Sequence, residues 1–281
     1  MAKRTQRPVK AYRNLEFLTS PDARPLRILA EFLEPASRFR RLKVRDTVVV
    51  FGSSRAESAK TARAALRAFD EGAKAARGHP KARGRSKKAQ AERARLEMGV
   101  KLACYYEDAA ELAMLLTRWA KSLNKGDRFV VVSGGGPGIM EAANLGAARG
   151  GGKSIGLNIS IPTEQDPNPH ISDGYSFEFH YFFMRKLWFL FLARAIVVFP
   201  GGFGTMDELM EMLTLIQTEK VTKPLPIVLY GSEYWDEVLD FDALVRWGTI
   251  SKEDLKLFHR SDDPEEAFEY LKTRLAGGRR R

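Results

Sequence analysis

The chain has a single cysteine, Cys104, in 281 residues. One thiol cannot form an intrachain disulfide, so a disulfide-stapled fold is excluded. The neighbours Leu102 and Tyr105 predict a packed position on a helix for this thiol rather than a nucleophile. No apolar run reaches the length of a membrane span. The N-terminal residues, Met1–Arg4, are not followed by the apolar region of a signal peptide. We therefore expect a cytoplasmic protein that does not enter a membrane.

Histidine is also scarce. None of the histidines has metal-ligand spacing to another histidine or to the cysteine. We therefore predict no metal ion and no cofactor. The four residues are His79, His170, His180 and His259.

The two signs of charge are unequal, with a formal net charge of +11. The basic residues gather in residues 1–13, 74–95 and 279–281, and the rest of the chain is mildly acidic. Such segments can bind nucleic acid by neutralising phosphates. Solvated segments in an arginine-rich chain explain the pattern better, so a nucleic-acid partner is not expected.

A glycine-rich segment, Pro200–Glu208, joins an apolar run at 195–199 to a helical pattern that includes Leu209. Continuous apolar runs of this length are typical of buried parallel strands. Glycines let a ligand approach the backbone, and the first N–H groups of a helix favour an anion. Thr205 adds a hydroxyl, and Glu208 adds a carboxylate one turn into the helix. The segment predicts a phosphate site with a carboxylate beside it.

Two further apolar runs end in turns of small residues. Residues 128–132 lead into Ser133–Gly138, and residues 47–51 lead into Gly52–Arg55. Three such strands predict an α/β fold, a Rossmann-like open parallel sheet with helices on both faces, which binds ligands at the carboxyl ends of its strands. Tight packing of a strand against a helix explains the glycines around Gly134 equally well.

The glycine turns exclude two common nucleotide motifs. The third glycine of a G-x-G-x-x-G fingerprint would fall on Ile139 in one turn and on Asp207 in the other. No Gly-Lys-Ser or Gly-Lys-Thr follows at the spacing of a Walker A loop. The chain is therefore expected to bind neither a dinucleotide nor a triphosphate in those ways.

The segment from Pro200 to Glu208 matches P-G-G-x-G-T-x-x-E at every fixed position, and an Arg185-Lys186 pair lies on the predicted helix before that strand. These residues resemble the Lonely Guy (LOG) family, whose members were formerly labelled possible lysine decarboxylases. The family usually has Glu where this chain has Met184.

The resemblance also includes the glycine turns at Gly52 and Gly134 and the later Lys223-Pro224, and it spans roughly residues 44–245. It implies a dimeric phosphoribohydrolase that cleaves the N-glycosidic bond of nucleoside 5′-monophosphates, including cytokinin riboside monophosphate and AMP. The older decarboxylase label is not supported, because pyridoxal phosphate needs a Schiff-base lysine and no lysine here has a recognisable cofactor-anchoring context.

The expected catalytic pair is Glu208 with Arg185. A carboxylate near the ribose stabilises an oxocarbenium-like state or activates water. Arg185 lies on an otherwise apolar helix, where a guanidinium needs a partner. Spacing alone favours a structural ion pair, whereas the resemblance implies that Arg185 approaches Glu208 and the ribose. The expected substrate- and phosphate-binding residues are Gly201, Gly202, Gly204, Thr205, Gly134, Gly135, Gly52, Ser53, Lys186 and Asp207.

Two of those residues also have a simpler interpretation, in which they do not bind the substrate. Lys186 also suits a solvated position or a subunit seam, and Asp207 also suits an exposed acid at a helix start. The aromatic-rich helix Phe182–Leu192 suits a homodimer seam. Two other functions stay open, namely a non-catalytic nucleotide or molybdenum-cofactor carrier and a DNA-processing protein on the same scaffold.

The predicted domain organisation has three parts. Residues 1–43 form a basic N-terminal extension with a docked helix, because Leu26, Leu29 and Leu33 recur at helical spacing. Residues 44–276 form the Rossmann-like nucleotide-binding catalytic domain, with a basic helical insertion at about 74–95 and a tail at 232–275 that is mainly helical. Residues 277–281 form a basic tail.

Overall fold

The computed structural model describes residues 7–75, 86–123, 128–161 and 166–277. Its strands form a seven-stranded, fully parallel sheet in the order β4-β3-β2-β1-β5-β6-β7. The predicted α/β class is therefore confirmed. The strands are β1 (Thr47–Phe51), β2 (Val130–Ser133), β3 (Ser154–Ile159), β4 (Ser176–Phe179), β5 (Ala193–Val198), β6 (Ile227–Tyr230) and β7 (Phe258–Ser261).

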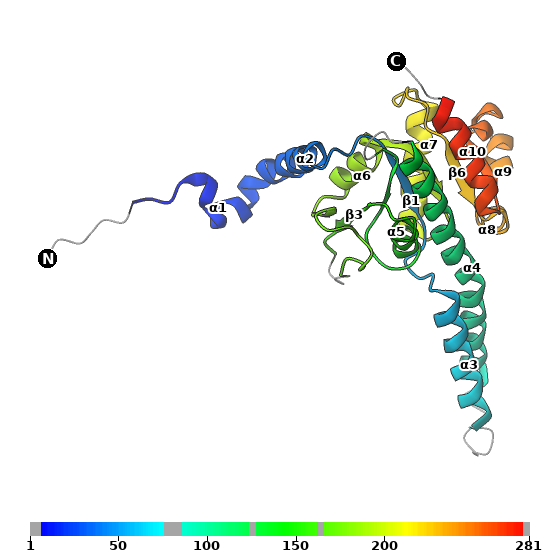
Figure 1. Ribbon diagram of the computed structural model, residues 1–281. Helices are drawn as coiled ribbons and strands as arrows, with labels where there is room; N and C mark the ends of the chain where they lie inside the picture. The colour runs from blue at the N-terminus through cyan, green and yellow to red at the C-terminus, as the bar shows by residue number, and fades with distance from the viewer. Residues whose placement is uncertain (1–6, 76–85, 124–127, 162–165, 278–281) are drawn as a thin grey trace.

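Helices cover both faces of this sheet (Figure 1). One face packs against α2, α6, α7, α8 and α9, and the other packs against α4, α5 and α10. The helices are α1 (Leu15–Thr19), α2 (Arg24–Arg41), α3 (Ala59–Ala75), α4 (Ser86–Ser122), α5 (Ile139–Arg149), α6 (Phe182–Phe191), α7 (Phe203–Gln217), α8 (Ser232–Val238), α9 (Phe241–Arg246) and α10 (Pro264–Gly277). Short 3₁₀ turns lie at Ala11–Arg13, Pro21–Ala23 and Glu253–Lys256.

The central strand β1 shows why the sequence reads as a continuous apolar run. Successive side chains of a strand point to opposite faces. Val48 and Val50 accordingly join the core under α4 and α5, whereas Val49 and Phe51 join the core under α6 and α7. Because both faces are covered, no position of β1 reaches solvent.

The order of the strands creates a switch point beside β1. The chain runs from β1 outward to β2, β3 and β4, and then returns to the other side of β1 as β5. In open parallel sheets the crevice at such a point, beyond the carboxyl ends of the strands, is where ligands bind. The turns after β1 and β5 flank this crevice.

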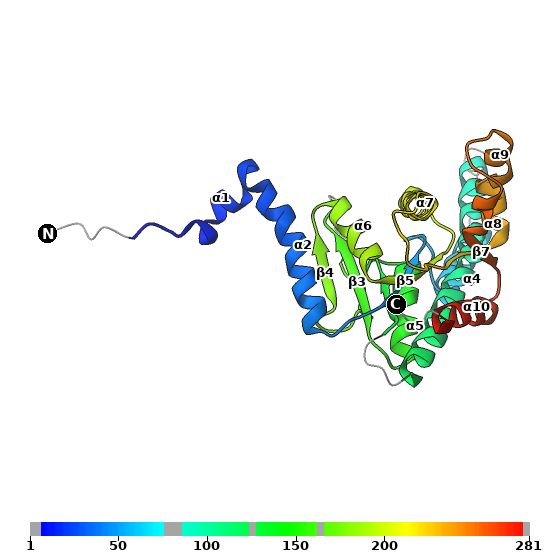
Figure 2. The same cartoon turned by 90° about the horizontal axis from the view of Figure 1, so that it is seen from above.

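Two parts of the molecule stand away from the sheet. Helix α3 and the N-terminal part of α4 project from one end, with Arg93 paired to Asp70 across the two helices at 3.0 Å, and α1 with the start of α2 projects from another (Figures 1 and 2). Residues 76–85 of the predicted basic insertion lie outside the described residues, as do residues 1–6 and 278–281. The proposed domain boundaries stay a prediction.

Two expectations are corrected. The expected helical tail contains a strand, β7, which pairs with β6 at the sheet edge and whose short polar sequence, Phe258–Ser261, gives no apolar run. Cys104 is exposed on α4 rather than packed, because the buried stripe of that helix passes through Ala103 and Tyr106. Among the described residues, no helix combines the length and apolar composition needed to cross a bilayer.

Candidate active site at the strand ends

The three glycine turns meet at the carboxyl edge of the sheet. We call residues 133–138 the β2 turn and residues 199–204 the β5 turn. Gly52 and Ser53 lie between them, because the Ser53 N–H donates to Pro200 O at 2.9 Å and Ser53 O accepts from Ile139 N at 3.0 Å. A Cβ on Gly52 would overlap the Ile139 side chain, so the Gly52 turn is tightly packed between the other two turns.

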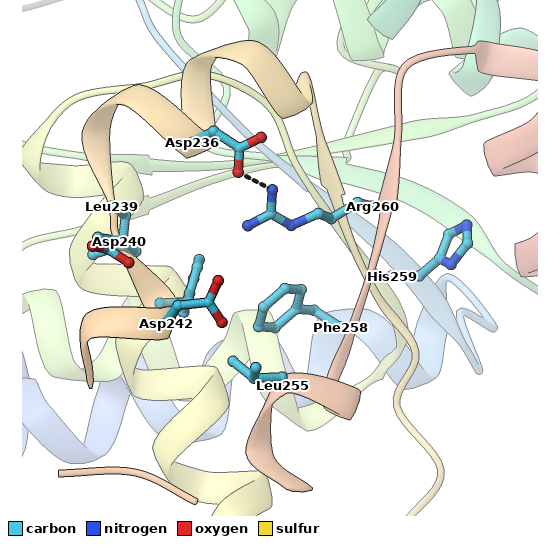
Figure 3. Close-up of a pocket in the computed structure, with 9 residues that line it drawn as sticks. Asp236, Leu239, Asp240, Asp242, Leu255, Phe258, His259 and Arg260 are labelled. Atoms are coloured by element: carbon cyan, nitrogen blue, oxygen red, sulfur yellow. Dashed lines mark hydrogen bonds and ion pairs between the residues drawn. The ribbon is translucent and has the colours of Figure 1, made fainter. Parts of the chain in front are cut away.

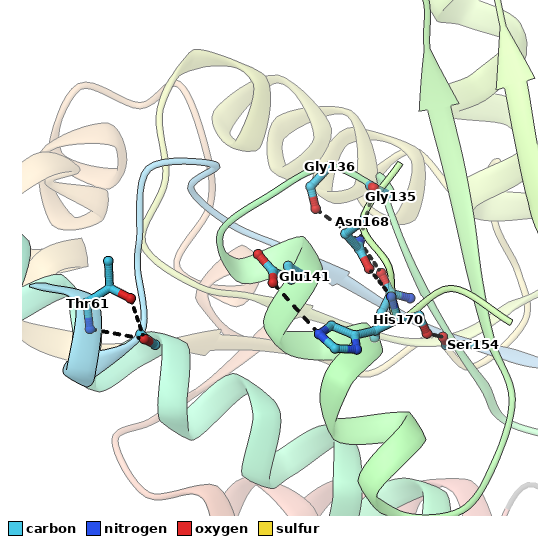
Figure 4. Close-up of polar contacts among 9 residues, drawn as sticks. Thr61, Gly135, Gly136, Glu141, Ser154, Asn168 and His170 are labelled. Atoms are coloured by element: carbon cyan, nitrogen blue, oxygen red, sulfur yellow. Dashed lines mark hydrogen bonds and ion pairs between the residues drawn. The ribbon is translucent and has the colours of Figure 1, made fainter. Parts of the chain in front are cut away.

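The β2 turn is held by buried hydrogen bonds (Figure 4). The Gly135 N–H donates to Ser133 Oγ at 3.1 Å, and Ser133 Oγ donates to Asn144 Oδ1 at 2.7 Å. The Asn168 Nδ2 group donates to the carbonyls of Gly135 and Gly136 and to Asn144 Oδ1. The Gly135 N–H is therefore committed inside the protein and is not free for a ligand.

Gly135 is a glycine for a steric reason. Its φ of 76° lies in the left-handed region, and a Cβ there would overlap Asn158 Oδ1. Asn158 in turn donates to Ser176 Oγ and to Phe177 O, each at 3.0 Å, which fixes its side chain. The sequence predicted that Gly135 approaches a ligand, whereas its close contact is to Asn158, which leaves no room for a substituent.

The β5 turn is open where the β2 turn is closed. Within the described ranges, no atom lies within 4 Å of an ideal Cβ on Gly202 or Gly204. The N–H groups of Phe203, Gly204 and Thr205, at the start of α7, have no acceptor among the described residues. Free N–H groups in the first turn of a 15-residue helix favour an anion.

Two contacts hold the β5 turn in this shape. The Thr205 hydroxyl packs against Gly201 so closely that a Cβ on Gly201 would overlap it. The Tyr234 hydroxyl donates to Gly201 O at 2.5 Å, so that carbonyl already has a donor inside the protein. The turn therefore presents donors rather than acceptors to the crevice.

Glu208 lies one turn into α7 and is only 4% exposed. Its Oε2 atom is buried and has no hydrogen-bond partner among the residues that the structure describes. Burial raises the pKa of Glu208 to about 7, and the positive charges of Arg185 and Lys186 only partly oppose this rise. A carboxyl group that titrates near neutrality with a free oxygen atom is suited to proton transfer or to stabilising a cation.

Arg185 reaches the same region from α6. Its guanidinium carbon lies over the rings of Phe182 and Phe189, at 5.3 and 5.6 Å from their centroids. The Nη1 atom lies 3.9 Å from an ideal Cβ on Gly134, so the guanidinium lies beside the β2 turn. Burial lowers the pKa of Arg185, and Glu208 contributes the largest opposing electrostatic effect.

Arg185 and Glu208 do not form a direct ion pair. In the described part of the chain no carboxylate lies within ion-pair distance of Arg185, and its buried Nε atom lacks an acceptor. Two buried, oppositely charged groups each keep a free polar atom. An isolated buried charge is costly, so this arrangement suits a polar ligand that would satisfy both groups.

Lys186 and Asp207 contact each other rather than the open turn. Lys186 Nζ lies 2.8 Å from Asp207 Oδ2 and 2.6 Å from Glu211 Oε2. The Lys186 side chain is 16% exposed, so these pairs are partly shielded from water. They join α6 to α7 and thereby fix the relative positions of Arg185 and Glu208, the residues adjacent to Lys186 and Asp207 in the sequence.

A separate cavity of the described residues lies away from these turns. It has a volume of about 680 Å³ at the β7 edge, between α8, α9 and the last strand (Figure 3). Asp236 and Arg260 form an ion pair across it, and Phe241 and Phe258 pack at its base. None of the predicted site residues lines this cavity.

Sequence reasoning missed Asn144, Asn158 and Asn168. Each is buried, and each helps to fix the β2 turn from a different segment of the chain. The only signal was the long polar loop before β4, which contains Asn168. Conversely, the predicted residues of the three turns, α6 and α7 all gather at one edge of the sheet.

A family model described as "Possible lysine decarboxylase" matches residues 140–271. The pyrimidine/purine nucleotide 5′-monophosphate nucleosidase of Escherichia coli (strain K12) is 33% identical over 110 residues, which are 36% of this chain and 24% of that protein. The probable cytokinin riboside 5′-monophosphate phosphoribohydrolase LOGL5 of Oryza sativa subsp. japonica is 30% identical over 125 residues, which are 43% and 49% of the two chains.

These matches confirm the resemblance found in the sequence. The chain spans about a quarter and about half of the lengths of the two curated relatives. Among solved structures, the molybdenum cofactor binding protein from Rippkaea orientalis is 20% identical, with a TM-score of 0.37, and the match covers 59% of this chain and 87% of that one. A likeness of that size carries no functional argument.

Proposed function

We propose that this chain, a relative of the Lonely Guy proteins, hydrolyses the N-glycosidic bond of nucleoside 5′-monophosphates to free base and ribose 5-phosphate. One observation carries the proposal. Glu208 is buried and has an unpaired oxygen atom. It lies one turn after the start of α7, whose first N–H groups are free. This is the arrangement that a phosphorylated ribose needs, with an anion site and a carboxylate a few ångströms apart.

The phosphate-binding role belongs to the β5 turn. The N–H groups of Gly204 and Thr205 and the Thr205 hydroxyl supply donors, while Gly201 and Gly202 let the phosphate approach the backbone. Gly134, Gly135, Gly52 and Ser53 form the opposite wall of the crevice and keep it in shape. Lys186 and Asp207 position α6 against α7.

The bond-breaking role belongs to Glu208 and Arg185. Cleavage of an N-glycosidic bond develops positive charge on the ribose, and an ionised Glu208 stabilises that charge or takes a proton from the attacking water. The ribose hydroxyls offer acceptors for the unpaired Nε of Arg185. Holding both groups in a buried site costs no reorganisation at the moment of reaction.

The proposal also names a substrate class. Both curated relatives are named for nucleoside 5′-monophosphate chemistry, one for pyrimidine and purine nucleotides and the other for a cytokinin riboside. We propose AMP and cytokinin riboside monophosphate as the first substrates to test, and a homodimer as the working assembly.

A panel of nucleoside 5′-monophosphates, incubated with the protein without added metal and then chromatographed, tests the proposal. We expect free base and ribose 5-phosphate from at least one nucleotide. The matching nucleoside should react at least about 100-fold more slowly, because it lacks the charge-assisted contacts to the β5 turn. Equal turnover of nucleoside and nucleotide would contradict the phosphate site.

The same assay separates an enzyme from a carrier. A carrier would bind a nucleotide in calorimetry and release no base from any member of the panel. Such a result would support the anion site and contradict the catalytic role of Glu208. Detectable base release that the Glu208→Gln variant loses would exclude the carrier.

A further inference from the structure

Helix α3 carries its positive charges along one side. Lys60, Arg63, Arg67 and Lys74 are all exposed, and we call these four residues the α3 stripe. With about 3.6 residues per turn, their positions fall within about 60° of one another around the helix. No other residue of α3 falls inside that sector. At a rise of about 1.5 Å per residue, the stripe follows the helix for about 21 Å.

The opposite side of α3 holds the residues that are shielded from solvent. Ala62 is buried, and Leu66 and Phe69 are half-buried. The main packing partner of α3 is α4, and Arg93 of α4 pairs with Asp70 of α3 at 3.0 Å. The stripe therefore points away from α4 and into solvent.

Neighbouring acids do not neutralise the stripe. Asp70 and Glu71 border it, but Asp70 is paired to Arg93, which also pairs with Glu97 at 2.5 Å. Among the residues that the structure describes, none of the four stripe cations has an ion-pair partner. The stripe consequently keeps a positive charge that the protein itself does not balance.

The exposed side of another helix shows that such a stripe is not a general property of the chain. In α10, Lys272 pairs with Glu269 at 2.8 Å, so charges of both signs alternate there. In α3, Arg63 and Arg67 are four residues apart, a spacing at which like charges repel and destabilise a helix. A polyanion lying along the stripe would relieve that repulsion.

The stripe lies on a part of the molecule that an extended partner can reach. Helix α3 and the N-terminal part of α4 stand clear of the sheet in both views (Figures 1 and 2). At the outer end of this projection, exposed Lys87 and Lys88 of α4 add to the charge of Lys74. The positive surface is therefore longest in the direction that leads away from the strand-end crevice.

We propose that the α3 stripe docks the chain on the phosphate backbone of double-helical DNA. The duplex carries about one negative charge per 1.7 Å of its axis, so a stripe of about 21 Å faces several phosphates at once. The sequence alone favours solvated basic segments. The structure adds the alignment of four unpaired cations on one side of a projecting helix. This inference does not depend on the hydrolase activity.

The shape of the projection favours DNA over duplex RNA. An α-helix with its side chains is about 10–12 Å across, which matches the major groove of B-form DNA at about 12 Å. The major groove of A-form RNA is deep and narrow, and side chains do not read it. A single cationic helix therefore reaches the phosphates along the groove of DNA more readily.

Two other polyanionic partners fit less well. Single strands bind proteins by stacking their bases on aromatic side chains, and the stripe contains none. A helix that binds a membrane surface needs a broad apolar face. In the described parts of α3 and α4, Met98 is the one large apolar side chain that is exposed.

Fluorescence anisotropy of a labelled DNA duplex of arbitrary sequence, titrated with the full chain, tests the docking. We expect wild-type affinity to fall about 100-fold between about 50 and 200 mM salt, because four phosphate contacts release counterions. The Lys60→Gln/Arg63→Gln/Arg67→Gln/Lys74→Gln variant should bind at least about 100-fold more weakly at the lower salt concentration. Its salt dependence should also be shallower, by about 3 in the logarithmic slope.

The matched control removes the same amount of charge outside α3. Arg149→Gln/Lys220→Gln/Lys252→Gln/Lys256→Gln changes four exposed cations of the body and should keep DNA affinity within about threefold, since distant charges are screened by salt. Loss of DNA affinity in this control equal to the loss in the stripe variant would overturn the proposal, because net charge alone would then explain binding.

A second variant guards against misfolding. Arg63→Lys/Arg67→Lys keeps the charge of the stripe and should bind DNA like the wild type, because phosphate contacts require charge rather than one residue type. Gln and Lys are helix formers as good as Arg, so circular dichroism should show unchanged helix content in every variant.

Three further results would each overturn the proposal. The first is no binding of the wild type to the DNA duplex at about 50 mM salt, where phosphate contacts are strong. The second is equal affinity of the stripe variant and the wild type. The third is binding of duplex RNA of the same sequence, or of polyglutamate, as tightly as DNA, which would assign the stripe to another polyanion.

Discussion

The β2 turn and the β5 turn lie at the same edge of the sheet and are both rich in glycine, but their glycines serve different purposes. In the β2 turn a Cβ on Gly135 would overlap the Asn158 side chain, and the backbone N–H is bonded internally. In the β5 turn Gly202 and Gly204 face open space. One set of glycines permits tight packing, and the other permits a ligand to approach.

Substitution of Gly135 should show the largest effect. Gly135→Ala places a side chain at a φ of 76° and against Asn158 Oδ1. The combined cost of the left-handed conformation and the overpacking is about 4 kcal/mol. Chemical denaturation should show that loss in the free energy of unfolding. A stability within 0.5 kcal/mol of the wild type would mean that Gly135 is not tightly packed against Asn158.

Substitution of Glu208 should affect turnover rather than stability. Glu208→Gln keeps the shape of the side chain and removes its charge. We expect turnover of the preferred nucleotide to fall about 10²–10³-fold, which is about 3–4 kcal/mol of barrier. Nucleotide affinity measured by calorimetry should persist, since the anion site is formed mainly by the backbone. Arg185→Ala should also lose activity. Wild-type turnover in Glu208→Gln would refute the catalytic role.

The pH dependence of stability should report the burial of Glu208. Its pKa is about 7 in the folded protein, against 4.5 for an ordinary glutamate side chain. The unfolded chain therefore releases this proton first, and folding stability decreases as the pH rises from 4.5 to about 7, by up to about 3 kcal/mol. Urea titrations of the wild type and of Glu208→Gln should diverge over this range. Parallel curves would place the pKa of Glu208 near its ordinary value.

The smallest effect is expected at Gly204. Gly204→Ala introduces a methyl group into open space at the start of α7, so the free energy of unfolding should stay within about 1 kcal/mol or rise slightly. Nucleotide affinity should fall about tenfold, because the methyl group occupies space that the phosphate needs. Unchanged affinity would show that the phosphate binds away from this glycine.

The sequence predicts those features that are encoded locally. Apolar runs followed by small residues indicate β1, β2 and β5, and the run from Pro200 to Glu208 indicates the open turn with its carboxylate. Because the carboxyl ends of neighbouring parallel strands meet at one edge, the gathering of the turns follows from the fold class.

Other features depend on contacts between distant segments. Asn168 bonds Gly135 from a separate loop, and its sequence neighbourhood resembles any polar loop. The strand β7 forms because β6 offers it an edge, not because its own residues are apolar. Whether Arg185 and Glu208 form a direct ion pair depends on side-chain positions that spacing along two separate helices does not determine.

The place of β1 in the sheet has a consequence for synthesis. This strand is made before the other strands of the sheet, yet one of its two neighbours, β5, is made only after β2, β3 and β4. Until Val198 has emerged, Phe51 lacks its pairing partner, and the turn after β5 that flanks the crevice is absent. The α3–α4 pair is local and can form earlier, so the strand-end crevice is among the last parts to assemble co-translationally. A nascent chain that pauses before β5 would carry an exposed edge on β1 and would lack Glu208.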